Sequence, residues 1–325
     1  MIKKVQVILE LFLNLYFFFI FVRFYVRIVS LNVFGENMKS LDKCWCGSGE
    51  NYSNCHMVLD LRLEELAKQG KIVPKHKHIK SQKQIEGIRE ACRINTLILD
   101  EVEKHIKAGM TTEDVDKIVY DKTLELGGKP ACLGYEGFPK SVCTSVNNVV
   151  CHGIPSKNVV LREGDILNVD CTTEVDGYFG DSSRMFVIGG KSTKEAEKLV
   201  RVTKECLDLC VEKIKPFDHV GDIGWLVSKH ARANGFSVVK ELGGHGVGLA
   251  MHEDPFVSHT AKKGTGMILV PGMGFTIEPM INAGRAGVCI DEGDGWTIWT
   301  LDDSLSAQWE YTLLMTETGL EILAK

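Results

Sequence analysis

The sequence lacks an excess of positive charge, a disulfide framework and any convincing internal repeat. Its 43 Asp and Glu residues outnumber its 38 Lys and Arg residues, so a net charge of -5 gives no basic footprint for nucleic acid. Three of the 11 cysteines cluster near residue 50 and the others are scattered, which is unlike a small secreted disulfide-rich domain. A chain of 325 residues with 44% hydrophobic residues therefore predicts one substantial core plus a small appendage, in a reducing, cytoplasmic setting.

Residues 1–37 form an apolar extension whose origin is a separate question. Residues 5–34 are about long enough to cross a bilayer, but two arginines, a glutamate and an asparagine interrupt the run. No small-residue cleavage site follows, which argues against a signal peptide and leaves a membrane anchor as the alternative. The mix of Phe, Leu, Ile, Val, Tyr, Lys and Asn is expected if AT-rich upstream DNA were translated. We therefore favour Met38 as the true start, and an intact mass that includes residue 1 would refute this.

A compact group of soft metal ligands follows within residues 44–56. Two cysteines separated by one residue and a later Cys-His pair supply four ligands for tetrahedral zinc, and the Gly-Ser-Gly turn between them lets the backbone fold back. The motif resembles the SEC-C motif, a small zinc module appended to various proteins, and this resemblance implies docking to another protein or to the ribosome. The alternative is a zinc-stapled knob with no partner. The expected ligands of one structural zinc ion are Cys44, Cys46, Cys55 and His56.

The chain after the zinc motif predicts a linker and then one α/β domain. We assign residues 38–60 to the zinc module, 61–80 to a linker and 81–325 to the main domain. A short helix is expected from residue 57, followed by a basic stretch in which His76 and His78 are solvated. Capping residues, apolar spacings of three and four, and terminal Gly or Pro then predict four amphipathic helices with strands between and after them. These helices are expected at 81–109, 111–128, 192–216 and 219–235.

Two acids lie on a predicted β-hairpin. In the stretch 165–188, a turn at Val175-Asp176 would place Asp170 directly opposite Asp181, and a turn at Asp176-Gly177 would make them diagonal neighbours. Either register brings both carboxylates within reach of a shared ion. A metal would explain why both stay ionised, because a buried pair of like charges otherwise repels. The alternative is a solvated turn with acidic residues, and a turn position is sufficient to explain the presence of Asp176.

Three further metal-ligating residues each lie in a glycine-rich or apolar stretch. His245 has glycines on both sides, which would let a substrate or metal approach the imidazole closely. Glu278 and Glu310 are single acids in apolar, strand-like runs, where an unpaired charge would be costly. Together with the hairpin pair they make four carboxylates and one imidazole, a set suited to two divalent first-row metal ions. The predicted ligands are Asp170, Asp181, His245, Glu278 and Glu310.

The order and content of these segments closely resemble the type I methionine aminopeptidases over roughly residues 76–325. The matching stretches are GYEGFPKSVCTSVNNVVCHGIP, GDILNVDCTTEVDGYFGDSSRMF, GGHGVGLAMHEDP, GMGFTIEPMINAG and SLSAQWEYTLLMTE. The resemblance implies the pita-bread α/β fold, a site for two divalent ions (Co, Mn, Fe or Zn) and removal of the initiator methionine before a small second residue. It also implies catalytic roles for Glu278 as proton shuttle, His252 at the scissile carbonyl and His152 at the scissile amide.

The same resemblance implies a substrate pocket and a weaker cation site. The pocket is apolar and sulfur-rich, as suits a flexible thioether. Phe138 stands where Tyr is frequent in the family, and Met251 where Phe is frequent. The auxiliary site for Na or K corresponds to Asn147, Val149 and Ser306. The pocket corresponds to Cys132, Tyr135, Phe138, Cys143, Met251 and Trp296.

Rival functions differ in features that the sequence displays. A prolidase or Xaa-Pro aminopeptidase would share the ligands, but the Cys-Tyr-Cys pocket and the SLSAQWE segment favour the methionine enzyme. A type II enzyme would carry a large insertion where only 32 residues separate His245 from Glu278. A non-enzymatic binding relative should be basic and lack ligands, and a membrane-tethered adaptor would be built on residues 5–34 and the zinc module. We expect a monomer that acts on nascent polypeptide N-termini and binds no specific nucleic acid sequence.

Overall fold

The computed structural model describes residues 38–325, which form two compact units that meet between His76 and Lys77. The expectations for residues 1–37 lie outside the described residues. No helix within residues 38–325 is long and apolar enough to cross a membrane. In the first unit a 3-10 turn at Tyr52–Asn54 precedes helix α2 (Met57–Lys68), which confirms the short helix expected from residue 57.

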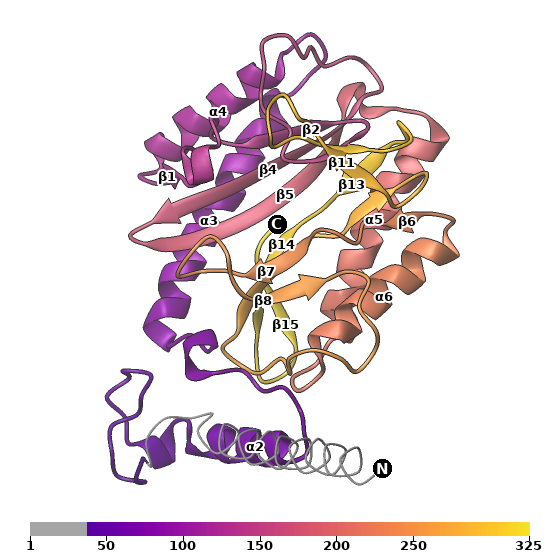
Figure 1. Ribbon diagram of the computed structural model, residues 1–325. Coiled ribbons are helices and arrows are strands. Elements are labelled where there is room, and N and C mark those ends of the chain that lie inside the picture. The colour runs from indigo at the N-terminus through magenta and orange to yellow at the C-terminus, as the bar shows by residue number, and fades with distance from the viewer. Residues whose placement is uncertain (1–37) are drawn as a thin grey trace, which may run out of the picture. The chain divides into compact units, whose positions relative to one another are not determined.

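Four helices of the second unit match the four amphipathic stretches. Ser81, Thr111 and Thr193 accept hydrogen bonds from backbone N–H groups in the first turn of α3, α4 and α5, which fixes where each helix begins. In Figure 1, α3 and α4 lie together on one side of the β-sheets and α5 and α6 on the other. The bounds are α3 (Gln82–His105), α4 (Thr112–Glu125), α5 (Lys194–Lys213) and α6 (Val220–Ala233).

Four antiparallel sheets occupy the space between the helix pairs. In the first sheet, β4 (Ile166–Val175) pairs with β1 (Lys129–Pro130), β2 (Cys143–Val146) and β5 (Tyr178–Val187). The largest has the order β15-β14-β9-β7-β8: Leu320–Ala324, Tyr311–Met315, Gly274–Ile277, Gly243–Gly246 and Glu253–Ser258. Two smaller sheets have the orders β13-β10-β6 (Ser306–Gln308, Met280–Asn282, Ser237–Val238) and β11-β12-β3 (Val288–Ile290, Ile298–Thr300, Val149–Cys151).

One apolar cluster packs α3 and α4 against the first sheet. Leu99 and Val115 from the helices and Leu167 and Val169 from β4 are fully buried in it. Each such side chain contributes about 1.5–3 kcal/mol when it is removed from water. This rigid layer supports the β4–β5 hairpin, which carries the first pair of acids. The arrangement is the pita-bread α/β architecture expected from the sequence.

Candidate metal and substrate site

The hairpin takes the second of the two registers left open by the sequence. Val175 pairs with Tyr178, so the turn consists of Asp176 and Gly177, both with positive φ. Asp170 then pairs with Ser183, and Asp181 pairs with Thr172. The two acids are therefore diagonal neighbours.

Glu278 and Glu310 lie at an interruption between strands rather than within them, and Glu310 makes an isolated bridge to Ser183. Ile277 pairs with Tyr311 in one ladder and Met280 with Gln308 in the next, and both pairs have the same register. Continuing that register places Glu278 opposite Glu310. The prediction that each glutamate lies inside a strand was therefore wrong, because each occupies the gap between two ladders.

The five predicted ligands converge at one place. His245, on β7, has its Nε2 3.4 Å from Glu278 Oε1 and 3.8 Å from Asp181 Oδ2. The ligand atoms of Asp181, His245 and Glu310 lie within 4.8 Å of one another. Asp170 lines the same cavity, which has a volume of about 540 Å³. Residues from four separate stretches of sequence thus share one site.

Burial raises the pKa of all four carboxyl groups, and repulsion between them raises it further at three of the four. Burial raises the pKa of Asp170 to about 7. Burial and then the charge of Asp170 raise the pKa of Asp181 and of Glu278, and burial followed by the charge of Asp181 does so for Glu310. Among the described residues that line the cavity there is no Lys or Arg to compensate this charge. A set of hard oxygen donors with no counter-charge fits divalent cations.

The imidazole of His245 is held in its neutral form. Its Nδ1 lies 3.0 Å from the carbonyl oxygen of Gly246, which can only accept, so Nδ1 carries the hydrogen and the lone pair of Nε2 faces the carboxylates. Its backbone N–H donates to Thr276 Oγ1 at 3.0 Å. Burial, followed by the nearby His252, lowers the pKa of His245 to about 4.

The glycines beside His245 allow the backbone of neighbouring strands to approach closely. A Cβ on Gly244 would lie 2.4 Å from the carbonyl oxygen of Thr276, and one on Gly246 would lie 2.2 Å from that of Asp254. These glycines therefore allow β7 to pack closely against β9 and β8. They position the imidazole through the backbone, and the expectation that they let a substrate or metal approach the ring stays a prediction.

The two other predicted active-site histidines also line the cavity. His152 follows β3 with a φ of 55°, and His252 lies in the turn between β7 and β8. His252 Nδ1 is 2.8 Å from the hydroxyl oxygen of Tyr135, and its ring centroid is 4.3 Å from that of His245. Burial lowers the pKa of both His152 and His252, so both are neutral at neutral pH and can donate or accept one hydrogen bond.

The predicted methionine pocket forms one wall of the same cavity. Phe138 and Trp296 meet edge to face with ring centroids 5.2 Å apart. Cys132, Cys143 and Met251 are buried beside them, and Tyr135 packs against the cluster. An apolar, sulfur-rich wall therefore faces the acid-lined metal site, as required if a thioether and a free amine are to be bound together.

Sequence reasoning missed the residues that hold the ligands in place. Thr276 Oγ1 donates to Glu278 Oε1 at 2.8 Å, and Gln308 Nε2 lies 3.2 Å from Glu278 Oε2. The backbone N–H of Glu278 donates to Nε2 of the buried His259 at 3.2 Å. The sequence carried one signal for them. Residues two apart in an extended segment lie on the same face, and Thr276 and Gln308 each stand two residues before a ligand.

The residues predicted to bind a monovalent cation lie near one another, and their hydrogen bonds do not involve the predicted metal ligands. The carbonyl oxygen of Asn147 accepts from the backbone N–H of Ser306 at 2.8 Å, and Val149 lies on β3. The side chain of Asn147 bonds to Asp165 and to the backbone N–H of Ile166. This site stays a prediction.

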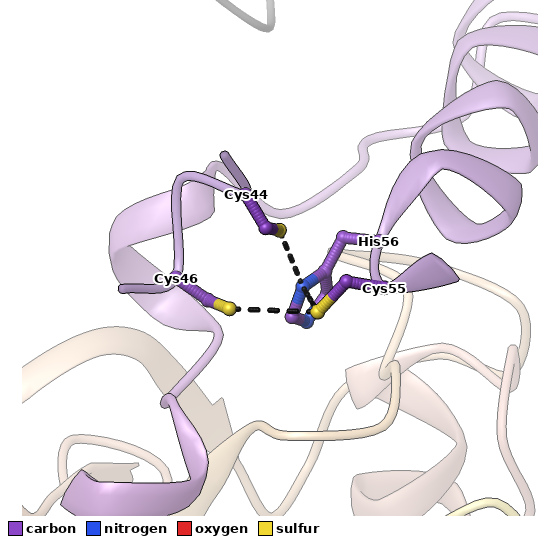
Figure 2. Close-up of side chains that lie close together, drawn as sticks. All are labelled: Cys44, Cys46, Cys55 and His56. Carbon is purple, nitrogen blue, oxygen red and sulfur yellow. Dashed lines mark hydrogen bonds between the residues drawn. The ribbon is translucent and has the colours of Figure 1, made fainter. Parts of the chain in front are cut away.

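The four expected zinc ligands of the first unit are assembled (Figure 2). His56 Nδ1 lies 3.2 Å from Cys44 Sγ and 3.1 Å from Cys55 Sγ, and the sulfurs of Cys46 and Cys55 are 3.5 Å apart. All four ligand atoms lie within 4.8 Å of one another. This is the donor set of a tetrahedral structural zinc site.

The prediction that His76 and His78 are solvated linker residues was wrong. The His76 ring stacks on Trp45 at 4.0 Å, and its Nε2 is 3.1 Å from the buried carboxylate of Asp60. Asp60 also accepts from Trp45 and Tyr52, which ties α2 to the cysteine loop. His78 belongs to the second unit and is 6% exposed.

Comparisons with known proteins found matches for both parts of the chain. Residues 86–317 match metallopeptidase family M24, and residues 42–57 match the SEC-C motif. A methionine aminopeptidase of Haemophilus influenzae is 47% identical over 75% of this chain and 91% of its own length. Methionine aminopeptidase A of Synechocystis sp. is 49% identical over 75% of this chain and 95% of its own length.

Solved structures agree as well. The methionine aminopeptidase of Rickettsia prowazekii superposes with a TM-score of 0.74 at 39% identity, over 76% of this chain and 99% of that one. The prolidase of Pyrococcus horikoshii has a TM-score of 0.59 at 22% identity, over 76% of this chain and 63% of that one. The second likeness shows the shared fold alone.

Proposed function

This chain belongs to metallopeptidase family M24 and, within it, to the methionine aminopeptidases, and we propose that its cavity removes the initiator methionine from nascent proteins. The observation that carries the proposal is the shared cavity, in which five metal-ligating side chains face a sulfur-lined and aromatic pocket. The metal ligands are Asp170, Asp181, His245, Glu278 and Glu310. The pocket for the methionine side chain consists of Cys132, Tyr135, Phe138, Cys143, Met251 and Trp296.

Two divalent ions, Co, Mn, Fe or Zn, bound by these ligands would supply Lewis acidity that favours deprotonation of a water molecule near neutral pH. The residues around them perform the remaining steps. Glu278 has one oxygen bound by Thr276 and the other by Gln308, so its carboxylate is oriented to take a proton and pass it to the leaving nitrogen. His252 donates to the developing oxyanion, and His152 contacts the scissile amide.

The substrate enters with its free amine toward the carboxylates and its thioether in the pocket. The four carboxylates favour a positively charged or metal-bound amine, which restricts cleavage to the first peptide bond. The cavity of about 540 Å³ has room for the methionine side chain and the start of the next residue, and the preference for a small second residue is part of this proposal. Nascent chains in the cytoplasm are the corresponding substrate.

The first unit has a separate role in this proposal. One zinc ion held by Cys44, Cys46, Cys55 and His56 stabilises the module, whose exposed apolar residues include Val58 and Leu61 on α2. We place its docking partner at the ribosome, where the substrate emerges. The catalytic unit acts as a monomer, because its site is complete within one chain.

Peptide hydrolysis tests the proposed activity. Full-length protein is stripped with a chelator, reloaded with Mn or Co, and incubated with Met-Ala-Ser, Phe-Ala-Ser and Ala-Pro. We expect metal-dependent release of methionine from Met-Ala-Ser alone. Cleavage of Ala-Pro would indicate the prolidase alternative, and no cleavage by folded, metal-loaded protein would refute the proposal.

A further inference from the structure

A buried lysine lies outside the metal site and the substrate pocket. Lys80 stands just before the N-cap of α3, and its side chain is 2% exposed. A buried ammonium requires a partner, because its desolvation is otherwise uncompensated. The Nζ atom contacts Glu253 Oε2. The backbone N–H of Lys80 donates to the carbonyl oxygen of Gly272 at 2.8 Å, so the base of the side chain is anchored as well.

The carboxylate of Glu253 connects this lysine to a turn. Its other oxygen, Oε1, accepts from the backbone N–H of Leu249 at 2.8 Å and from that of Ala250 at 3.3 Å. These residues belong to the turn between β7 and β8. The next two residues are Met251, in the methionine pocket, and His252, beside the metal ligands. One carboxylate therefore joins a rigid helix start to the segment that carries two site residues.

The turn has a second anchor at its start. The backbone N–H of Phe179 donates to the carbonyl oxygen of Gly248 at 3.0 Å, and the N–H of Gly248 lies 3.2 Å from the carbonyl oxygen of Ala250. At its other end, the β7–β8 ladder pairs Gly246 with Glu253. Glu253 thus serves both as a ladder residue and as the acceptor that fixes the middle of the turn.

We propose that Lys80 is a positioning residue for peptide cleavage: through Glu253 it holds the turn 249–252 so that His252 and Met251 face the substrate. This rests on the proposed function, because His252 is assigned there to the scissile carbonyl. The lysine acts without touching the substrate. Its loss frees the carboxylate from its fixed position and lets the turn move, and small displacements of a positioned donor are costly in rate.

Hydrogen exchange tests the connection without any substrate. Lys80→Met removes the ammonium, and Glu253→Gln removes the charge while keeping an oxygen for the turn amides. We expect both variants to accelerate amide exchange in peptide 247–254 at least tenfold. Lys77→Met is the matched control, since Lys77 is exposed and pairs with the exposed Asp254 at 3.4 Å. Unchanged exchange in both test variants would overturn the proposal, and Glu253→Gln decides it if Lys80→Met does not fold.

Kinetic measurements distinguish a positioning role of Lys80 in catalysis from a purely structural role. We expect Lys80→Met to lower kcat/KM for Met-Ala-Ser about 10- to 100-fold. Combined with His252→Ala it should add little, because the lysine acts through that histidine. A multiplicative loss, or no loss despite faster exchange, would reduce Lys80 to a structural residue and overturn the proposal. If the wild-type protein released no methionine, the proposed function and the positioning role would both fall, while hydrogen exchange would still decide the connection itself.

Discussion

Removing divalent ions with a chelator should make the stability of this protein fall as the pH rises from 5 to 8. Burial raises the pKa of Asp170 in the folded protein to about 7, from an ordinary value of 3.8. The folded state then binds this proton more tightly than the unfolded state does. The resulting stabilisation is complete below the unfolded pKa and is lost as the pH rises through the folded pKa. Asp181, Glu278 and Glu310 act in the same direction, since their pKa values are also raised.

The size of the effect follows from the shift at Asp170. About three pKa units correspond to about 4 kcal/mol of folding free energy lost between acidic and alkaline pH. For a domain of this size that is a decrease of about 10 °C in Tm. Asp170→Asn keeps the shape of the side chain but cannot ionise. In chelator it should therefore exceed the stability of the wild type by about 1.5 kcal/mol at pH 5 and by about 4 kcal/mol at pH 8.

Urea unfolding of chelated wild type, Asp170→Asn and Asp176→Asn from pH 5 to 8.5 measures this difference. Asp176 is the matched control, because it lies at the exposed turn of the same hairpin. Added Mn should reverse the order, making the wild type more stable than Asp170→Asn at pH 8. The reasoning is refuted if the chelated wild type and Asp170→Asn keep a constant difference across the pH range.

Three other substitutions test separate parts of the structure. Gly244→Ala should lower the free energy of unfolding by about 3 kcal/mol, because its Cβ would meet a backbone oxygen; equal urea midpoints would contradict this. Met251→Ala should reduce kcat/KM for Met-Ala-Ser about 10- to 100-fold by opening the pocket, and an unchanged ratio to Phe-Ala-Ser would argue against that assignment. Cys46→Ala should lower bound zinc by one ion per chain while Cys289→Ala, at an exposed cysteine, does not; equal zinc contents by elemental analysis would disprove the site.

Local signals were sufficient to predict the helices and the two hairpin acids of the site. The capping residues Ser81, Thr111 and Thr193 act within one turn, so the helix starts were readable from sequence. The hairpin acids were found for the same reason, although two registers remained open. Asp-Gly is a preferred sequence for a two-residue hairpin turn in which both residues have positive φ, as Asp176 and Gly177 do. This preference favours the observed register.

Long-range pairing could not be derived in this way. Lys80 and Glu253 are far apart in sequence, and each alone resembles an ordinary surface charge. His78 is buried although it lies within a basic stretch. Thr276 and His259 orient ligands through contacts that appear only when the strands are paired. A single sequence contains the residues of these contacts but not the register that joins them.

The register itself explains why the site requires metal. Asp170 and Asp181 are diagonal neighbours on one antiparallel pair of strands, and the continued register of a second pair sets Glu278 opposite Glu310. Like charges at such positions destabilise a sheet, so the fold places electrostatic repulsion at two points around one cavity. Divalent cations held by these carboxylates would relieve both repulsions, and the neutral His245 would complete the site without adding charge. Folding stability and metal affinity are therefore coupled through the same four carboxylates, and substitutions that weaken metal binding by removing charge should stabilise the chelated protein.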